Sequence, residues 1–245
     1  LTPPPAKVWA EKRGIPVLQP KSLKDFEISG DYDLFVLAAY GKIIPKRILE
    51  LPKGGILNVH PSLLPLLRGP SPIQSAILSG AKETGVSIML LDEEMDHGPV
   101  LDSEKLSIED KPSYSELEKK LGKIGGKKLC EIIPKWVRGE IKAEAQDHSS
   151  ATYCKKIEKQ DGYIKPGIIT GIETDREKHA EAERKVRALN PDPSTYTILN
   201  IRDKEMRIKI TEAKTEDGKF VPVKVIPEGK KEMKWEDFLK GNLVK

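Results

Sequence analysis

Three short apolar segments in the N-terminal part constrain the fold more than any other feature of this chain. They span residues 33–38, 55–60 and 86–91, and each is bounded by glycine, proline or aspartate. Runs of this length and composition are typical of buried β-strands. Because continuous apolar strands separated by helices favour a parallel sheet covered on both faces, the sequence predicts an α/β fold.

Two helices are expected beside these strands. Residues 71–79 carry apolar side chains on one side, and this helix is predicted to start at Pro72. The clearest helix spans residues 113–139, where apolar residues recur at steps of three and four, and Ser113 forms a capping box with Glu116.

Two adjacent glycines, Gly125 and Gly126, lie in the middle of that long helix. Each weakens a helix by roughly 1 kcal/mol against alanine, so we expect close backbone packing at this point. Residues 122–128 superficially resemble a phosphate loop, but they lack its spacing and lie inside an amphipathic pattern.

Polar side chains follow the second apolar segment. Asn58 and His60 are two residues apart, so in a strand both side chains point to the same face. Tyr40 follows the first segment, and ligands of parallel sheets bind outside the carboxyl ends of the strands. An amide and an imidazole can hold a developing oxyanion, and the later Asp96 can orient the imidazole. The alternative explanation of Asn58 and His60 is an ordinary polar strand end.

The C-terminal half has a different pattern. Residues 140–157 lack a clear period, which suits a linker, and residues 173–189 form a charged, helix-like run before Asn190-Pro191. Three β-leaning runs follow, at residues 195–201, 206–211 and 220–226, with turn signals at 216–218 and 228–229. They predict a small β-rich domain.

The whole net charge of +4 comes from residues 151–245. Residues 1–150 carry 21 basic and 21 acidic side chains, whereas residues 151–245 carry 21 basic and 17 acidic ones. A basic module can favour a polyanionic partner by releasing counterions. The alternative is a surface rich in ion pairs that suits high temperature.

Other chemistry-bearing residues are sparse. No apolar stretch approaches the roughly 20 residues that cross a bilayer, and no signal pattern is present, so we expect a cytoplasmic protein. Cys130 and Cys154 are isolated, and we expect both to be buried or half-buried. The four histidines show no ligand spacing, so no metal is expected.

A set of motifs extends along nearly the whole chain. The motifs are residues 58–65 with Arg68-Gly69, residues 72–77, 84–89 and 96–98, and residues 2–7, 14–20, 39–45 and 187–191. This set resembles the formyltransferases that use 10-formyltetrahydrofolate, and within that group the methionyl-tRNA formyltransferases. The resemblance implies formyl transfer from this co-substrate to the α-amine of methionine on initiator tRNA.

The resemblance also implies roles for individual residues. Asn58 would donate to the formyl oxygen, His60 would act as electrostatic partner or proton shuttle, and Asp96 would orient His60 and help to remove the amine proton. The residues implied for co-substrate binding are Tyr40, Gly41, Lys42, Ile43, Ile44, Ser62, Leu63, Leu64, Pro65, Leu91 and Asp92. Arg68 would meet an anion of the substrate or pair with a loop carboxylate. His97 is expected to be an exposed turn residue.

The domain organisation follows from the same resemblance. It implies a Rossmann-like catalytic domain over residues 1–139, a linker over 140–157, and a tRNA-binding, oligonucleotide-fold-like (OB-like) β-barrel over 158–245. Family members begin with a strand, a helix, a second strand and a basic loop before the equivalent of residues 2–7. We therefore expect residues to precede Leu1 and the N-terminal strands of the sheet to be missing. Residues 162–178 depart from the family pattern. We expect a monomer.

Three alternatives to this function stay open at this point. A related formyltransferase could act on glycinamide ribonucleotide or on an amino sugar linked to a nucleotide. A folate hydrolase would replace the amine by water. A non-catalytic RNA-binding protein could use the same scaffold, although it would have no need of Asn58, His60 and Asp96 together.

Overall fold

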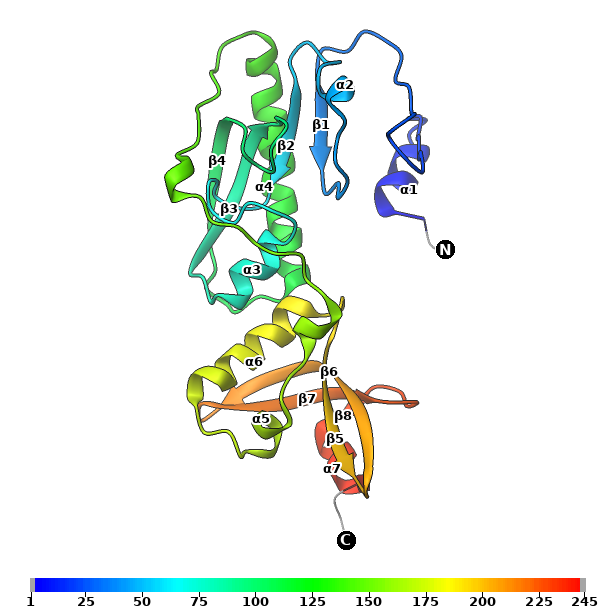
Figure 1. Cartoon of the computed structure of the whole chain (residues 1–245), viewed down its shortest axis with the longest axis vertical. Helices are drawn as coiled ribbons and strands as arrows, with labels where there is room; N and C mark the ends of the chain where they lie inside the picture. Colours follow the sequence, from blue (N-terminus) through cyan, green and yellow to red (C-terminus); the bar gives the residue numbers. More distant parts are fainter. Residues whose placement is uncertain (1–2, 243–245) are drawn as a thin grey trace.

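The computed structural model describes residues 3–242, which form two parts, each built on its own β-sheet (Figure 1). The first part contains α1 (Pro5–Glu11), β1 (Phe35–Ala38), α2 (Lys46–Leu49), β2 (Ile56–His60), α3 (Pro72–Leu78), β3 (Glu83–Leu90), β4 (Val100–Ser107) and α4 (Tyr114–Val137). Then follow the 3-10 turns η1 (His148–Ser150) and η2 (Lys159–Gly162), α5 (Pro166–Thr170), α6 (Arg176–Leu189), β5 (Thr195–Ile201), β6 (Lys204–Glu216), β7 (Lys219–Pro227), β8 (Met233–Lys234) and α7 (Trp235–Asn242).

The first sheet is mixed rather than parallel. Its order is β1-β2-β3-β4, and only β1 and β2 run parallel, whereas the β2–β3 and β3–β4 pairs are antiparallel. The α/β class is confirmed, but the prediction of an all-parallel sheet is wrong. β3 is a continuous apolar run because it lies between β2 and β4 and both of its faces are covered. A strand in that position is apolar whether its neighbours run parallel or antiparallel to it.

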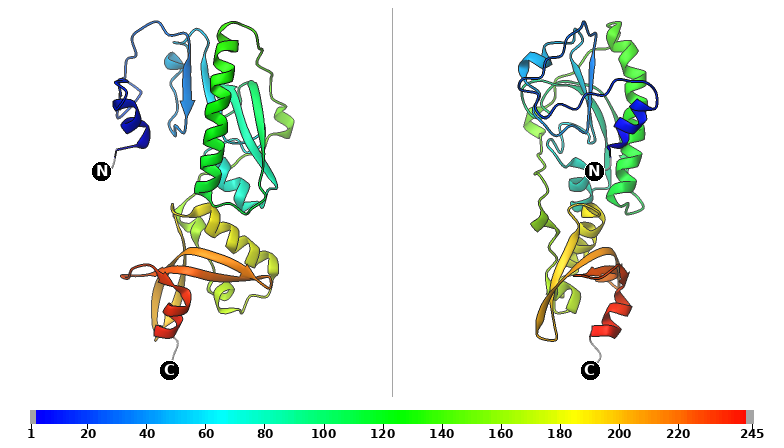
Figure 2. Two further views of the ribbon diagram at one scale, coloured as in Figure 1. Left: turned by 180° about the vertical axis from the view of Figure 1, so that it is seen from behind. Right: turned by 90° about the vertical axis from the view of Figure 1, so that its right-hand side faces the viewer.

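Helix α4 packs along one face of this sheet (Figure 2). A Cβ atom added at Gly125 would lie only 2.6 Å from Cγ1 of Val59 in β2, which confirms the predicted close packing there. Gly126 has open space around it, so the prediction does not hold for this second glycine. The helix starts with the predicted capping box, and hydrogen bonds from Ser113 hold the pKa of the Glu116 carboxyl below its usual range.

The second sheet is antiparallel, with the order β5-β6-β7-β8. The three predicted runs become β5, β6 and β7, with β6 and β7 longer than expected, while β8 and α7 were not predicted. Within residues 3–242 no strand pairing joins β5 to β8.

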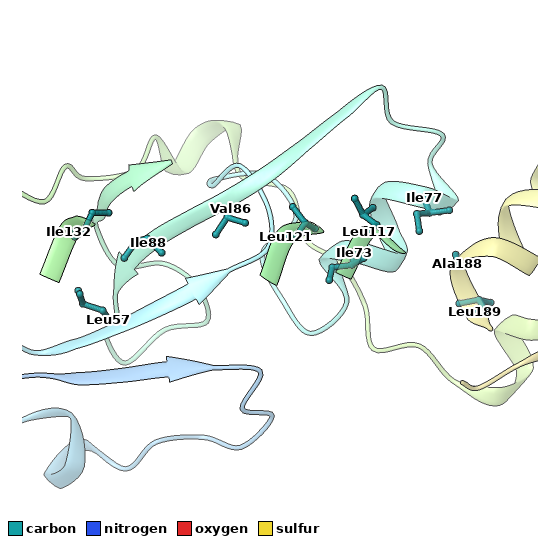
Figure 3. Close-up of a cluster of buried hydrophobic side chains, with 10 residues drawn as sticks. All are labelled: Leu57, Ile73, Ile77, Val86, Ile88, Leu117, Leu121, Ile132, Ala188 and Leu189. Carbon is teal, nitrogen blue, oxygen red and sulfur yellow. The ribbon is translucent and has the colours of Figure 1, made fainter. Parts of the chain in front are cut away.

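Helix α6 lies between the two sheets (Figure 1). Its last residues, Ala188 and Leu189, are completely buried in the core of the first part, next to Ile77 of α3 (Figure 3). Ala182 and Val186, from the same helix, belong to the core of the second part. The two cores are therefore joined through one helix.

The segment between α4 and α5 contacts the first part closely. Thr152 accepts a hydrogen bond from the Leu67 N–H at 2.9 Å, and Cys154 is buried against the loop after β2. Cys130 is exposed, so the prediction that it is buried or half-buried is wrong.

Candidate active site

The carboxyl end of β2 presents two buried polar side chains. Asn58 is 8% exposed and His60 is 4% exposed. Val59 between them faces Gly125 of α4, so Asn58 and His60 point to the opposite face of the sheet. The spacing of two residues therefore places both polar groups on the side that α4 does not cover.

Asp96 reaches these two side chains from the connection between β3 and β4. Its Oδ1 atom lies 3.4 Å from Asn58 Nδ2 and 3.5 Å from His60 Nδ1. Its Oδ2 atom accepts a hydrogen bond from the Gly69 N–H at 2.7 Å. The structure thus brings an amide, an imidazole and a carboxylate together, and we call Asn58, His60 and Asp96 the polar trio.

The imidazole ring of His60 is contacted at both nitrogens. Nε2 lies 3.0 Å from the carbonyl oxygen of Leu67. Since a carbonyl oxygen can only accept, Nε2 carries a hydrogen and donates it. Nδ1 is then the nitrogen that can exchange a proton, and it faces the Asp96 carboxylate.

The loop after β2 presents backbone groups to the polar trio. Leu67 has a φ of +56° and Gly69 a φ of +114°. A Cβ atom at position 69 would lie 2.5 Å from the carbonyl oxygen of Cys154, so only glycine fits this backbone approach. The loop supplies the Leu67 carbonyl to His60 and the Gly69 N–H to Asp96.

Comparisons with known proteins show which family this chain belongs to. Residues 2–133 match the family model described as formyl transferase. A methionyl-tRNA formyltransferase of Chloroflexus aggregans is 41% identical over 234 residues, which cover 92% of this chain and 71% of the relative. This chain belongs to the methionyl-tRNA formyltransferase family. The Bacillus subtilis family member is 37% identical over 98% of this chain and 81% of its own length, so the predicted resemblance is confirmed.

Solved structures share the fold of this formyltransferase. A methionyl-tRNA formyltransferase from Clostridium thermocellum superposes with a TM-score of 0.58 at 20% identity, over 82% of this chain and 78% of the other. HypX from Aquifex aeolicus, solved in complex with tetrahydrofolic acid, gives a TM-score of 0.64 at 17% identity. That match covers 84% of this chain, which spans 38% of the HypX chain.

The residues predicted to bind the co-substrate lie in three places in this formyltransferase. Residues 40–44 follow β1, which ends beside β2 because Ala38 pairs with Val59. Ile43 is 92% exposed and lines a hollow of about 390 Å³ together with Lys42. Residues 62–65 follow β2 directly, and residues 91–92 begin the connection that carries Asp96.

Arg68 is buried, at 1% exposure, and its guanidinium group donates hydrogen bonds to three side chains. Its Nε and Nη2 atoms donate to Gln146 Oε1 at 3.1 and 2.7 Å. Nη1 donates to the Tyr153 hydroxyl at 3.3 Å, and Nη2 to His148 Nδ1 at 2.9 Å. None of these partners is the loop carboxylate that the sequence suggested.

His97 is half-buried rather than exposed. Its Nδ1 atom lies 2.7 Å from Asp92 Oδ2, and its ring stacks on His148 with centroids 4.0 Å apart. Gln146 and His148 were not predicted as part of the site, because they lie in a segment with no helical or strand period. No sequence pattern in that segment signals the contact.

Two features are absent from the part of the chain that the structure describes. Among residues 3–242, His, Cys, Asp and Glu side chains form no group of three or more that could hold a metal ion. No helix there combines the length and apolar character needed to cross a bilayer.

Proposed function

We propose that this formyltransferase moves a formyl group from 10-formyltetrahydrofolate to the α-amine of methionine carried on initiator tRNA. The observation that carries the proposal is the convergence of the polar trio at the carboxyl end of β2. Relatives named methionyl-tRNA formyltransferase, at 35% to 41% identity, align with both parts of the chain rather than with the catalytic part alone.

Each member of the polar trio has a role in this mechanism. Asn58 donates from Nδ2 to the formyl oxygen while negative charge develops there, and a donor of this kind contributes about 10²- to 10³-fold in rate. His60, bound between the Leu67 carbonyl and Asp96, stabilises the same charge or moves a proton. Asp96 removes the proton of the attacking amine, directly or through water, which contributes about 10²- to 10⁴-fold. The amine is itself the nucleophile: its new bond to the formyl carbon replaces the bond from that carbon to N10 of the co-substrate, which leaves as tetrahydrofolate, so no covalent enzyme intermediate is needed.

The co-substrate would lie against the polar trio. The backbone of residues 40–44 and of residues 91–92 would hold the pterin, and residues 62–65 would form the wall beside the reacting carbon. The pairing of Ala38 with Val59 supports this, since it brings the ends of β1 and β2 to the same edge of the sheet.

The second part is proposed to bind the tRNA. We place the catalytic domain at residues 1–139, the linker at 140–157, and an OB-like barrel at 158–245. The excess of basic residues after position 150 and the antiparallel sheet support this assignment. The second part also carries a cationic and aromatic pair, because the guanidinium group of Arg207 lies 3.8 Å above the ring of Tyr196. The proposed enzyme is a cytoplasmic monomer.

The acceptor is tested by a parallel assay. The protein is incubated with 10-formyltetrahydrofolate and one of four acceptors: methionyl initiator tRNA, uncharged initiator tRNA, glycinamide ribonucleotide or a nucleotide-linked amino sugar. We expect formyl transfer to the methionyl-tRNA alone, followed as acid-stable formylmethionine. The sugar is included because several sugar formyltransferases share the fold. Transfer to another acceptor, or tRNA binding without transfer, contradicts the proposal.

A further inference from the structure

Gln146 joins the buried Arg68 to the turn that carries Asp96. The side chain is 8% exposed, and its amide nitrogen donates to two backbone carbonyls, that of Asp96 at 2.9 Å and that of Gly98 at 2.7 Å. Its oxygen accepts both hydrogen bonds from Arg68. Every donor and acceptor of this amide is therefore used, in an orientation that the guanidinium fixes.

The turn held by Gln146 is tight. Asp96 has a φ of +49°, in the left-handed region that residues other than glycine rarely adopt. A Cβ atom at Gly98 would lie 2.0 Å from the carbonyl oxygen of Leu90. Such a backbone persists only where its surroundings determine it, and the two hydrogen bonds from Gln146 span the turn at this place.

Arg68 fixes the other end of the same arrangement. The peptide N–H that follows it, that of Gly69, donates to the Asp96 carboxylate at 2.7 Å. Arg68 also donates to His148, whose ring stacks on His97 within the turn. Arg68 and Gly69 are thus connected to the turn at three points. Gly69 binds the Asp96 carboxylate, and Arg68 is linked to the backbone of the turn through Gln146 and to the His97 ring through His148.

We propose that Arg68 and Gln146 are positioning residues that hold the Asp96 carboxylate toward Asn58 and His60. This rests on the proposed function, because it assigns them a part in the same formyl transfer. Both side chains are buried and bonded to other protein groups, at 1% exposure for Arg68 and 8% for Gln146. Their effect reaches the reaction through Asp96, and a misplacement of about 1 Å at a reacting group can cost about 10²-fold in rate.

The substitution Gln146→Glu tests this directly. A glutamate has the same size and still accepts from Arg68, but its carboxylate cannot donate to the carbonyls of Asp96 and Gly98. We expect kcat to fall by about 10- to 100-fold, while the KM for 10-formyltetrahydrofolate stays within about twofold. Gln19→Glu is the matched control, because it makes the same chemical change at an exposed position where a carboxylate still accepts from Lys7, and it should keep wild-type kcat.

A double-mutant cycle separates positioning from general structural damage. If Gln146 acts through Asp96, the substitution Gln146→Glu should change kcat by less than about twofold in an Asp96→Ala background. Equal losses in both backgrounds, or an unchanged kcat in the single variant, overturn the proposal.

Circular dichroism shows whether Gln146→Glu folds. If it does not fold, a second variant tests the proposal. Arg68→Lys keeps the charge but replaces the planar guanidinium by a single nitrogen, which cannot reach all the partners of Arg68 at once, and it should show the same loss of kcat at constant KM. If neither variant folds, the pair is structural and the proposal fails. All variants are assayed with the acceptor that the wild-type protein formylates. Failure of the wild-type protein with every acceptor therefore refutes the proposed function itself.

Discussion

Asp96 differs from Asn58 and His60 in how its position is fixed. The two strand residues are fixed by the register of β2 against β3, where Asn58 pairs with Met89 and His60 with Ser87. Asp96 lies in a connection and depends on hydrogen bonds to its carboxylate and its carbonyl group. A change at Asp96 should therefore affect the chemistry while leaving the sheet intact.

Replacing Asp96 by alanine should lower kcat by about 10²- to 10⁴-fold, because it removes the proposed proton acceptor for the amine. Asn58→Ala should cost about 10²- to 10³-fold through the lost donor to the formyl oxygen. Steady-state kinetics with methionyl initiator tRNA measure both losses, and circular dichroism checks the fold. Asp110→Ala, at an exposed position, is the control and should match the wild type. An Asp96→Ala variant with near-normal turnover would remove Asp96 from the mechanism.

The sequence predicts part of this site but not the residue Gln146 that contacts the turn around Asp96. Asn58 and His60 could be placed on one face from their spacing, and Asp96 was assigned through family resemblance. Gln146 could not be found, because a lone glutamine in an irregular segment carries no periodic signal. Its importance depends on three backbone and side-chain partners that lie far away in the sequence.

At the scale of elements, α4 carries two adjacent glycines in different surroundings. Gly125→Ala should lower the free energy of unfolding by about 1–2 kcal/mol, since overpacking against Val59 outweighs the gain in helix propensity. Gly126→Ala meets open space and should raise it by about 0.5–1 kcal/mol. Urea denaturation of both variants measures the difference. Stabilisation by both substitutions would show that the contact of α4 with β2 is looser than described.

The elements themselves were only partly predictable. The long helix was found with its cap because its period and capping box are local signals. Strand β4 was missed, since Val-Leu-Asp-Ser-Glu-Lys-Leu-Ser mixes charge into a strand at the edge of the described sheet, next to β3. The predicted direction of the strands was also wrong, because a strand that is buried on both faces can have either parallel or antiparallel neighbours.

At the scale of the whole molecule, α6 couples the two parts. Arg184 donates to the carbonyl oxygen of Leu78 at 2.9 Å, and Arg187 donates to that of Pro112 at 3.0 Å. Both contacts cross from α6 to the first part, next to the buried Ala188 and Leu189. Because the same helix also fills the second core, neither part can lose α6 without exposing apolar surface of its own.

This coupling predicts that the protein unfolds in one cooperative transition, and that Leu189→Ala weakens the connection. The substitution leaves a cavity beside α3 and α4 and should cost about 2–5 kcal/mol. We further expect differential scanning calorimetry to resolve two transitions in the variant, with the first part melting earlier, since the second core keeps Ala182 and Val186. Leu18→Ala is the matched control, because Leu18 is 72% exposed, and it should stay within about 0.5 kcal/mol of the wild type. A Leu189→Ala variant that melts like the wild type would mean that the buried end of α6 contributes little to joining the two cores.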